Sequence, residues 1–406
     1  MKAKNPKLTK KYILTTILPV VLVILATLTS IYFINQKSDI TFGNNKGVAY
    51  EKAVVVNVLK ENLSEADISG AQTGTQEVEV KITSGEYKGR TFQTTNYATY
   101  AYNVVCKPGT RVIVTINTAQ NLQVVNVYTY DRSMPIYILI GVFALVLCLI
   151  GGWKGFKSLM GLAFTFVCII FVFIPLLYRG ISPIWAAVLL AVAATFVTMM
   201  LIDGWNAKTV SAIIGTILCV SIAGVISTVA GYFANINGFT MADTEDLVVI
   251  ARQTGLQLRG ILFASILISS LGAIMDVCMS VASSLNEIYE HNPQMNRFQL
   301  FKSGINVGRD MMGTMSNTLI LAFTGGSLTS LIMLKAYGIS FNQLFSSPGI
   351  TTEIIQGMAG SLGVFLAVPI VAAIASQLLV LGANWRDLFK RKQKREAFEQ
   401  AVQENQ

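Results

Sequence analysis

Long apolar segments are the feature that most constrains this chain, because eight of them recur along its 406 residues. A helix needs about 20 predominantly apolar residues to cross the hydrocarbon core of a bilayer. Only 13% of the residues are charged, whereas a soluble domain has about 25%. The sequence therefore predicts a polytopic α-helical membrane protein with about eight transmembrane helices. The segments lie near residues 12–34, 135–152, 158–178, 183–202, 209–233, 259–284, 315–335 and 357–382.

The positive charge of the chain, a net +9, gathers beside the apolar segments. Five lysines precede the first segment, and a basic tail follows the last one. Such flanking clusters are typical of cytoplasmic loops and of contact with an anionic lipid surface. We therefore expect both termini to be cytoplasmic and the lipid bilayer to be the main partner. No nucleic-acid partner is expected, because no binding motif accompanies the charge.

Residues 35–133 differ from the rest of the chain, because they are polar and rich in β-branched side chains. Turn signals separate five short runs, at 53–59, 76–83, 90–95, 111–118 and 122–130. This pattern predicts a small extracytoplasmic all-β domain, barrel-like or OB-like, after the first helix. The predicted domains are 1–34 (N-terminus and anchor), 35–133 (β-rich domain), 134–384 (seven transmembrane helices) and 385–406 (basic cytoplasmic tail).

One apolar segment carries a carboxylate in its middle. At 100° per residue, the small and polar residues of 260–287 share one face, and Asp276, Ser280 and Glu287 belong to it. An ionisable group at membrane depth costs at least a few kcal/mol unless it faces protein or water. Asp276 is therefore a candidate ion-site residue. The alternative is that it caps or pairs near the cytoplasmic mouth.

A second polar face follows in the next apolar segment. Asp310, Thr314, Asn317 and Thr324 fall together at helical spacing. Carboxylate, amide and hydroxyl oxygens are hard ligands that suit a proton, Na⁺ or a divalent cation. Two neighbouring faces of this kind would line a hydrated path or an ion site. Hydrogen bonding between helices is the other explanation, and we favour it for Thr314 and Thr324.

Three loop regions carry further expectations. The loop from Glu287 to Thr314 is predicted to be cytoplasmic, and Arg309 in it would pair with Asp276 or Glu287 as a static brace or a gate. Residues 242–254 are predicted to form a short helix on the outer membrane surface, with Asp243 as its N-cap. Residues 385–403 are predicted to form a polar, mainly basic helix in the cytoplasm.

Motifs of several enzyme classes are missing from the sequence. It has no phosphate-binding P-loop, no H-E-x-x-H pair and no nucleophile elbow. Four of the five cysteines lie in apolar segments, and one histidine is present, so no metal site or cofactor is expected. We therefore expect a protein that is not an enzyme.

Five stretches of the chain combine polar, glycine and apolar residues in distinctive patterns: SGEYKGRTFQTTN at 84–96, GGWKGFKSL at 151–159, LGAIMDVCMSVASSLNEI at 271–288, HNP at 291–293 and NVGRDMMGTMSNTLILAF at 306–323. In these stretches the chain resembles the YibE/F-like family of bacterial multitransmembrane proteins. The resemblance implies a multi-pass protein of the bacterial plasma membrane. Members often show an Asp-Asp pair where this chain has Met275 before Asp276, which argues against a two-carboxylate metal site.

Two functions from different classes fit these patterns. The first is a permease or secondary transporter of an ion or small solute that uses an intramembrane carboxylate. Asp276 would carry the coupling ion or proton, and Asp310 and Asn317 would line its site. The second is a membrane scaffold or accessory subunit in which residues 40–130 bind an envelope protein. Intramembrane proteolysis would need Asp276 and Asp310 to be apposed, but their surroundings do not match the motifs of such proteases.

Overall fold

The computed structural model describes residues 18–35, 48–65, 70–100, 102–117, 124–236 and 244–403, with side chains as far as residue 381. The chain divides into two compact units, which are treated separately below. The membrane unit comprises Met1–Asp39 and Ile150–Gln406, and the second unit comprises Ile40–Leu149. The N-terminal lysines and residues 12–17 of the first apolar segment lie outside the described residues.

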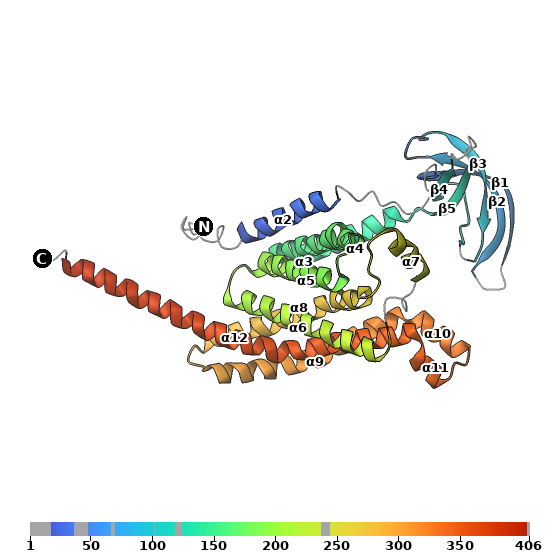
Figure 1. Cartoon of the computed structure of the whole chain (residues 1–406). Helices are drawn as coiled ribbons and strands as arrows, with labels where there is room; N and C mark the ends of the chain where they lie inside the picture. Colours follow the sequence, from blue (N-terminus) through green and yellow to red (C-terminus); the bar gives the residue numbers. More distant parts are fainter. Residues whose placement is uncertain are drawn as a thin grey trace. The chain divides into compact units, whose positions relative to one another are not determined.

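Five antiparallel strands form the core of the second unit, here called the β-domain (Figure 1). Their order in the sheet is β3-β2-β1-β4-β5. The sheet curls at bulges in β1, and the Thr94 hydroxyl on β3 donates a hydrogen bond to the Val125 carbonyl on β5. The two edge strands therefore approach each other, which confirms the predicted barrel-like domain. The strands are β1 (Val48–Glu65), β2 (Gln72–Ile82), β3 (Thr91–Ala98), β4 (Arg111–Asn117) and β5 (Val124–Tyr130).

Alternating residues of the strands fill the interior of the β-domain. On β2, Val78 and Ile82 are buried, whereas the residues next to them in sequence are more exposed. Gln76 and Asn96 are buried too, and the Gln76 Oε1 atom accepts hydrogen bonds from Asn96 Nδ2 (3.1 Å) and from the backbone N–H of Cys106 (2.8 Å). These bonds satisfy the buried amides and hold the β3–β4 connection in place. Burial raises the pKa of the Cys106 thiol to about 11.

Asp131 connects the last strand to the helix that follows it. Its Oδ1 atom accepts hydrogen bonds from the Ser133 N–H (3.0 Å) and the Ser133 hydroxyl (2.6 Å), at the start of α3 (Ser133–Cys168). Lys52 of β1 lies 3.5 Å from Oδ2. The hydrogen bonds from Ser133, followed by the charge of Lys52, lower the pKa of the Asp131 carboxyl.

Six helices among the described residues are long and apolar enough to cross a membrane, or seven if the bent pair α9 and α10 forms one span. This confirms a multi-pass α-helical architecture. The helices after α3 are η3 (Ile169–Phe173), α4 (Ile174–Tyr178), α5 (Pro183–Asp203), α6 (Ala207–Phe233), α7 (Thr244–Gln253), α8 (Ile261–His291), α9 (Arg297–Gly326), α10 (Leu328–Ala336), α11 (Phe341–Ser346) and α12 (Pro348–Gln403), and α2 (Leu18–Asn35) precedes β1.

The count differs from the eight predicted segments because 135–152 and 158–178 fall in one helical run of 46 residues. Gly152 interrupts that run with a non-helical backbone (φ 54°, ψ −134°). A left-handed φ of this kind is accessible to glycine at no steric cost. Two helices therefore meet at Gly152, and the sequence separates them at the same place. The predicted eight therefore compares with six or seven candidate spans among the described residues, and the division at Gly152 accounts for one of the differences.

Close contacts of small residues hold α6, α8, α9 and α12 together. A Cβ atom added to Gly215 or Gly308 would lie 2.2 Å from a methyl group of Val371 or Val368 on α12. A Cβ atom on Gly224 would lie 2.6 Å from Leu267 on α8. The absence of these Cβ atoms lets the backbones approach closely, as is common between membrane helices.

Polar contacts define the two ends of the membrane unit. At one end, Lys154 and Lys208 both pair with Asp203, at 3.8 and 3.3 Å. At the other end, the Arg179 guanidinium donates to the carbonyls of Phe33 (3.0 Å) and Ile34, the last turn of α2. The segment 153–178 therefore runs from one end to the other.

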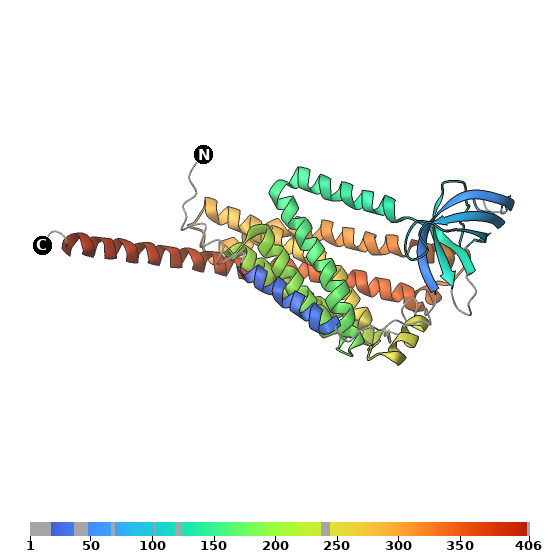
Figure 2. The same cartoon turned by 90° about the horizontal axis from the view of Figure 1, so that it is seen from above.

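Two boundaries of the predicted membrane segments are wrong. The expected loop from Glu287 to Thr314 is mostly helix, because α8 continues to His291 and a capping box of Asn296 and Gln299 starts α9 immediately afterwards. The last span begins at Pro348 rather than at 357, and α12 continues as one helix to Gln403 (Figure 2). The short helix predicted within 242–254 is confirmed as α7, although its expected cap, Asp243, lies outside the described residues.

Candidate functional site

The polar face of α8 lies opposite the face that packs in the membrane unit. Asp276 and Glu287 are exposed on it, and Ser280 is half-buried. The opposite face of the helix is buried and includes Ile274 and Leu285. The sequence thus identified a polar face, and the described residues leave its Asp276 and Glu287 side chains exposed.

The polar face of α9 points away from the packed helices in the same way. Asp310, Thr314 and Asn317 are exposed. The buried residues Gly304 and Gly308 lie on the face that meets α12. The Thr314 hydroxyl donates within its own helix, to the carbonyls of Asp310 and Met311 at 3.2 Å each. The interhelical bond that we favoured for Thr314 is therefore replaced by a local one.

Asp276 and Asp310 lie at nearly the same depth. Asp276 is 15 residues before the end of α8, and Asp310 is 13 residues after the start of α9. At 1.5 Å per residue, both carboxylates are about 20 Å from the turn between the helices. Within the described part of the chain, neither side chain has a hydrogen bond or an ion pair. Unpaired carboxylates in the middle of a membrane-spanning helix need water or further protein beside them.

The structure does not form the predicted brace at the end of this hairpin. Glu287 lies 3.5 Å from His291, one turn further along α8. Arg309 is exposed and has no ion pair among the residues that the structure describes. It therefore bridges neither to Asp276 nor to Glu287 in this conformation.

A bent helix marks a second site, which sequence reasoning missed. The helix pair α9 and α10 is bent by 57°, with Ser327 between the two parts. Gly325 and Gly326 precede the bend, and a Cβ atom on either would touch nothing within 4 Å. The bend is therefore not imposed by crowding at these glycines, whose low helix propensity favours a break. It faces the start of α8 and the first turns of α12.

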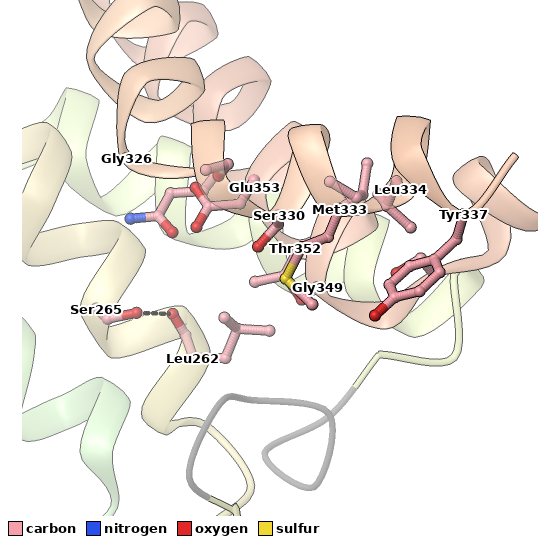
Figure 3. A pocket seen from close by; sticks show the side chains of 14 residues that line it. Leu262, Ser265, Gly326, Ser330, Met333, Leu334, Tyr337, Gly349, Thr352 and Glu353 are labelled. Carbon is pink, nitrogen blue, oxygen red and sulfur yellow. Dashed lines mark hydrogen bonds between the residues drawn. The ribbon is translucent and has the colours of Figure 1, made fainter. Parts of the chain in front are cut away.

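A pocket of about 490 Å³ lies at this bend. Figure 3 shows Ser265 of α8 on one side of it, with Ser330 of α10 and Thr352 and Glu353 of α12 on the other. Glu353 is the one charged residue in the lining. This volume is in the range of small-molecule sites, about 300–1,000 Å³.

Two hydroxyl groups of the pocket lining have no hydrogen-bond partner among the described residues. Ser327 is 8% exposed, and its Oγ atom is unpaired, as is the Oγ1 atom of Thr352. An unsatisfied buried hydroxyl costs about 1–3 kcal/mol. Gln356, also in the lining, donates through Nε2 to the Ser269 hydroxyl of α8 (3.0 Å) and thereby joins the pocket to the polar face of α8. The pocket therefore offers oxygen atoms that a ligand or water would satisfy.

Glu353 escaped the sequence analysis because the last span was predicted to begin at 357, which placed this carboxylate in a loop. The Gly325-Gly326 pair was the available signal, since it interrupts an apolar segment and points to a broken helix. Among the described residues, no group of three or more His, Cys, Asp or Glu side chains is arranged to hold a metal ion.

Comparison with known proteins gives two family matches. A family model described as YibE/F-like protein matches residues 139–380, and a model described as YibE/F family N-terminal domain matches residues 49–130. The first match covers the membrane-spanning region after the β-domain, and the second covers the five strands. No curated protein and no solved structure matches the chain.

Proposed function

This chain belongs to the YibE/F-like family, and from that premise and its geometry we propose that it is a permease or secondary transporter of an ion or a small solute. In this proposal it acts as a carrier and has no enzymatic activity of its own. The bend between α9 and α10, beside a polar pocket with one carboxylate, is the observation that carries the proposal. Broken helices around a polar site are a common design of secondary transporters, because the interrupted backbone lines a cavity.

The two polar regions have different roles in the proposal. The pocket at the bend binds the transported species, and Glu353 supplies its charge. Asp276 is a second carboxylate on the path, and Asp310 and Asn317 of α9 are its other polar residues. The support for this role is the position of Asp276 in the middle of α8, a candidate membrane span, where a carboxylate is stable only if water or protein faces it. The Ser269–Gln356 hydrogen bond links the two regions.

We also propose that the protein lies in a bacterial plasma membrane with both termini in the cytoplasm. Basic residues support this orientation, because Lys154 and Lys208 lie together at the end where α5 meets α6. Arg297 and Lys302 belong to the start of α9. Cationic residues are retained on the cytoplasmic side of short loops.

Flux through reconstituted liposomes tests the proposed function. The wild-type protein is expected to move at least one member of a panel of ions, followed with ion-selective and pH-sensitive dyes. Glu353→Gln should reduce that flux at least tenfold because it removes the charge of the pocket, and Asp276→Asn should impair coupling to the proton or ion. Glu290→Gln, an exposed carboxylate at the end of α8, serves as the control. Wild-type flux in both variants would overturn the proposal.

A cluster of tyrosines favours a second candidate function, a membrane scaffold whose β-domain binds an envelope protein. Tyr50, Tyr102 and Tyr128 are 53%, 57% and 43% exposed. The ring of Tyr128 lies 5.4 Å from that of Tyr50 and 6.2 Å from that of Tyr102, measured between centroids. Exposed aromatic clusters are enriched at protein interfaces.

The two functions predict opposite rankings of variants. A scaffold would lose function in cells when the three tyrosines are replaced by serine, and it would tolerate Glu353→Gln and Asp276→Asn. A transporter would show the reverse. The comparison requires equal amounts of each variant in the membrane fraction.

A further inference from the structure

Among the residues that the structure describes, the pocket at the bend is lined by one carboxylate and by no basic side chain. That carboxylate is Glu353, and no described lysine, arginine or histidine belongs to the lining. Two helix N-termini, those of α10 and α12, lie at the pocket, and each is worth about +0.5 of a charge. The C-terminus of α9 contributes about −0.5. The full charge of an ionised Glu353 therefore leaves the pocket net negative.

The other polar atoms of the pocket are neutral oxygens. Serine and threonine hydroxyls come from three helices, and Gln356 adds an amide. The hydroxyls of Ser327 and Thr352 are buried and unpaired. Oxygen atoms of this kind are the ligands that hard cations prefer.

The number of carboxylates that line the pocket indicates whether it suits a monovalent or a divalent cation. Affinity for divalent ions such as Ca²⁺ increases with the number of carboxylate ligands, and this pocket supplies one. Within the described part of the chain, no second acidic side chain lines this pocket. A single carboxylate surrounded by neutral oxygen ligands neutralises the charge of one monovalent cation.

From these observations we infer that the pocket between α8, the α9–α10 bend and α12 binds a monovalent cation, with Glu353 as its counter-charge and the Ser327 and Thr352 hydroxyls among its ligands. Two classes of ligand carry a single positive charge and fit this description: an alkali-metal ion and a small organic ammonium ion. The inference rests on the proposed function in that it assigns a substrate or coupling species to the same site.

Binding is measured without transport, on the purified full-length protein in detergent. The unfolding temperature is followed while NaCl, KCl or choline chloride is added at constant pH. A ligand that binds the folded state raises this temperature saturably. At least one of the three salts is expected to do so for the wild-type protein. A response to Na⁺ or K⁺ identifies an alkali-metal site, and a response to choline alone identifies an organic-cation site.

Three variants separate specific binding from general salt effects. Glu353→Gln should abolish the saturable shift, and Ser327→Ala should weaken the apparent affinity several-fold while the protein folds normally. Glu290→Gln should respond as the wild type does. The inference is overturned if no salt shifts the wild type, if Glu353→Gln responds equally, or if only pH affects the wild type and the pocket thus binds a proton alone. If Glu353→Gln does not fold, an unchanged affinity in Ser327→Ala decides against it.

The binding result and the flux result are independent of each other. Saturable cation binding without flux in liposomes would support this site and contradict the transporter. Flux of a neutral solute without cation binding would support the transporter and contradict this site.

Discussion

Asp131 is a carboxylate that stabilises the folded state at the point where the last strand of the β-domain joins α3. It accepts two hydrogen bonds from Ser133 and faces Lys52 across 3.5 Å. Both contacts favour the charged form and lower its pKa. A carboxylate with a lowered pKa stabilises the folded state above its unfolded pKa of about 4. That stability is lost as the pH falls through the folded value.

Asp131→Asn is therefore expected to lower the unfolding temperature at pH 7, by an amount equivalent to at most about 1 kcal/mol, because the amide keeps an acceptor for Ser133 but loses the negative charge that faces Lys52. The difference from wild type should shrink as the pH falls from about 4 through the lowered pKa of the folded state, below which the Asp131 carboxyl is neutral as the amide is. Thermal unfolding of the full-length protein between pH 3 and pH 7 measures this. Glu86→Gln, at an exposed turn position, is the control. A difference that stays constant across this range would contradict the assigned role of the charge.

At the scale of elements, the packing of α9 depends on where its glycines lie. Gly308 meets α12 so closely that a Cβ atom would lie 2.2 Å from a Val368 methyl group. Gly313, on the same helix, has nothing within 4 Å of the corresponding position. The bend at Ser327 and the close contact at Gly308 together place the polar lining of the pocket against α12.

Gly308→Ala should destabilise the membrane unit by about 1–3 kcal/mol, because the added methyl group overpacks the contact with Val368. Gly313→Ala should be neutral or stabilising by up to about 1 kcal/mol, since alanine favours a helix over glycine. Unfolding of both variants in detergent, under the same conditions, gives the comparison. Equal stability of the two variants would mean that α9 does not pack on α12 through Gly308.

At the scale of the molecule, the directions of the helices place several chain segments at one end of the membrane unit. Gly304 lies next to Ala372, and Gly360 lies next to Leu319, so α9 and α12 are antiparallel. The turn at 292–296 and the C-terminal part of α12 are therefore at the same end. Our proposed orientation puts this end in the cytoplasm.

Cysteine labelling of intact cells tests this orientation. A cysteine in place of Gln294, in the turn between α8 and α9, should be protected from a membrane-impermeant maleimide. A cysteine in place of Lys88, at an exposed turn of the β-domain, should be labelled. Permeabilised cells should label both, and the unchanged chain gives the background from its five native cysteines. Labelling at position 294 and protection at position 88 in intact cells would mean that the protein has the opposite orientation.

Local patterns predicted much of this fold. The runs at 53–59 and 111–118 are rich in β-branched residues, and they form strands in which alternate residues are buried in the barrel. The short helix predicted within 242–254 was found as α7, and the acidic residues Glu245 and Asp246 in its first turn favour a helix start there. The start of α12 was missed, because Pro348, Gly349 and the polar residues after them resemble a loop. Proline is nevertheless well tolerated in the first turn of a helix.

The sequence by itself determined the apolar segments, the five strands and the polar faces that contain Asp276 and Asp310, because each is a periodicity along the chain. Only the tertiary structure decided what those faces meet. It left both carboxylates exposed, and it brought Glu353 beside Ser327 at the bend of α9 and α10. Helical periodicity states which side chains share a face. What covers that face depends on packing between residues far apart in sequence, which no local pattern contains.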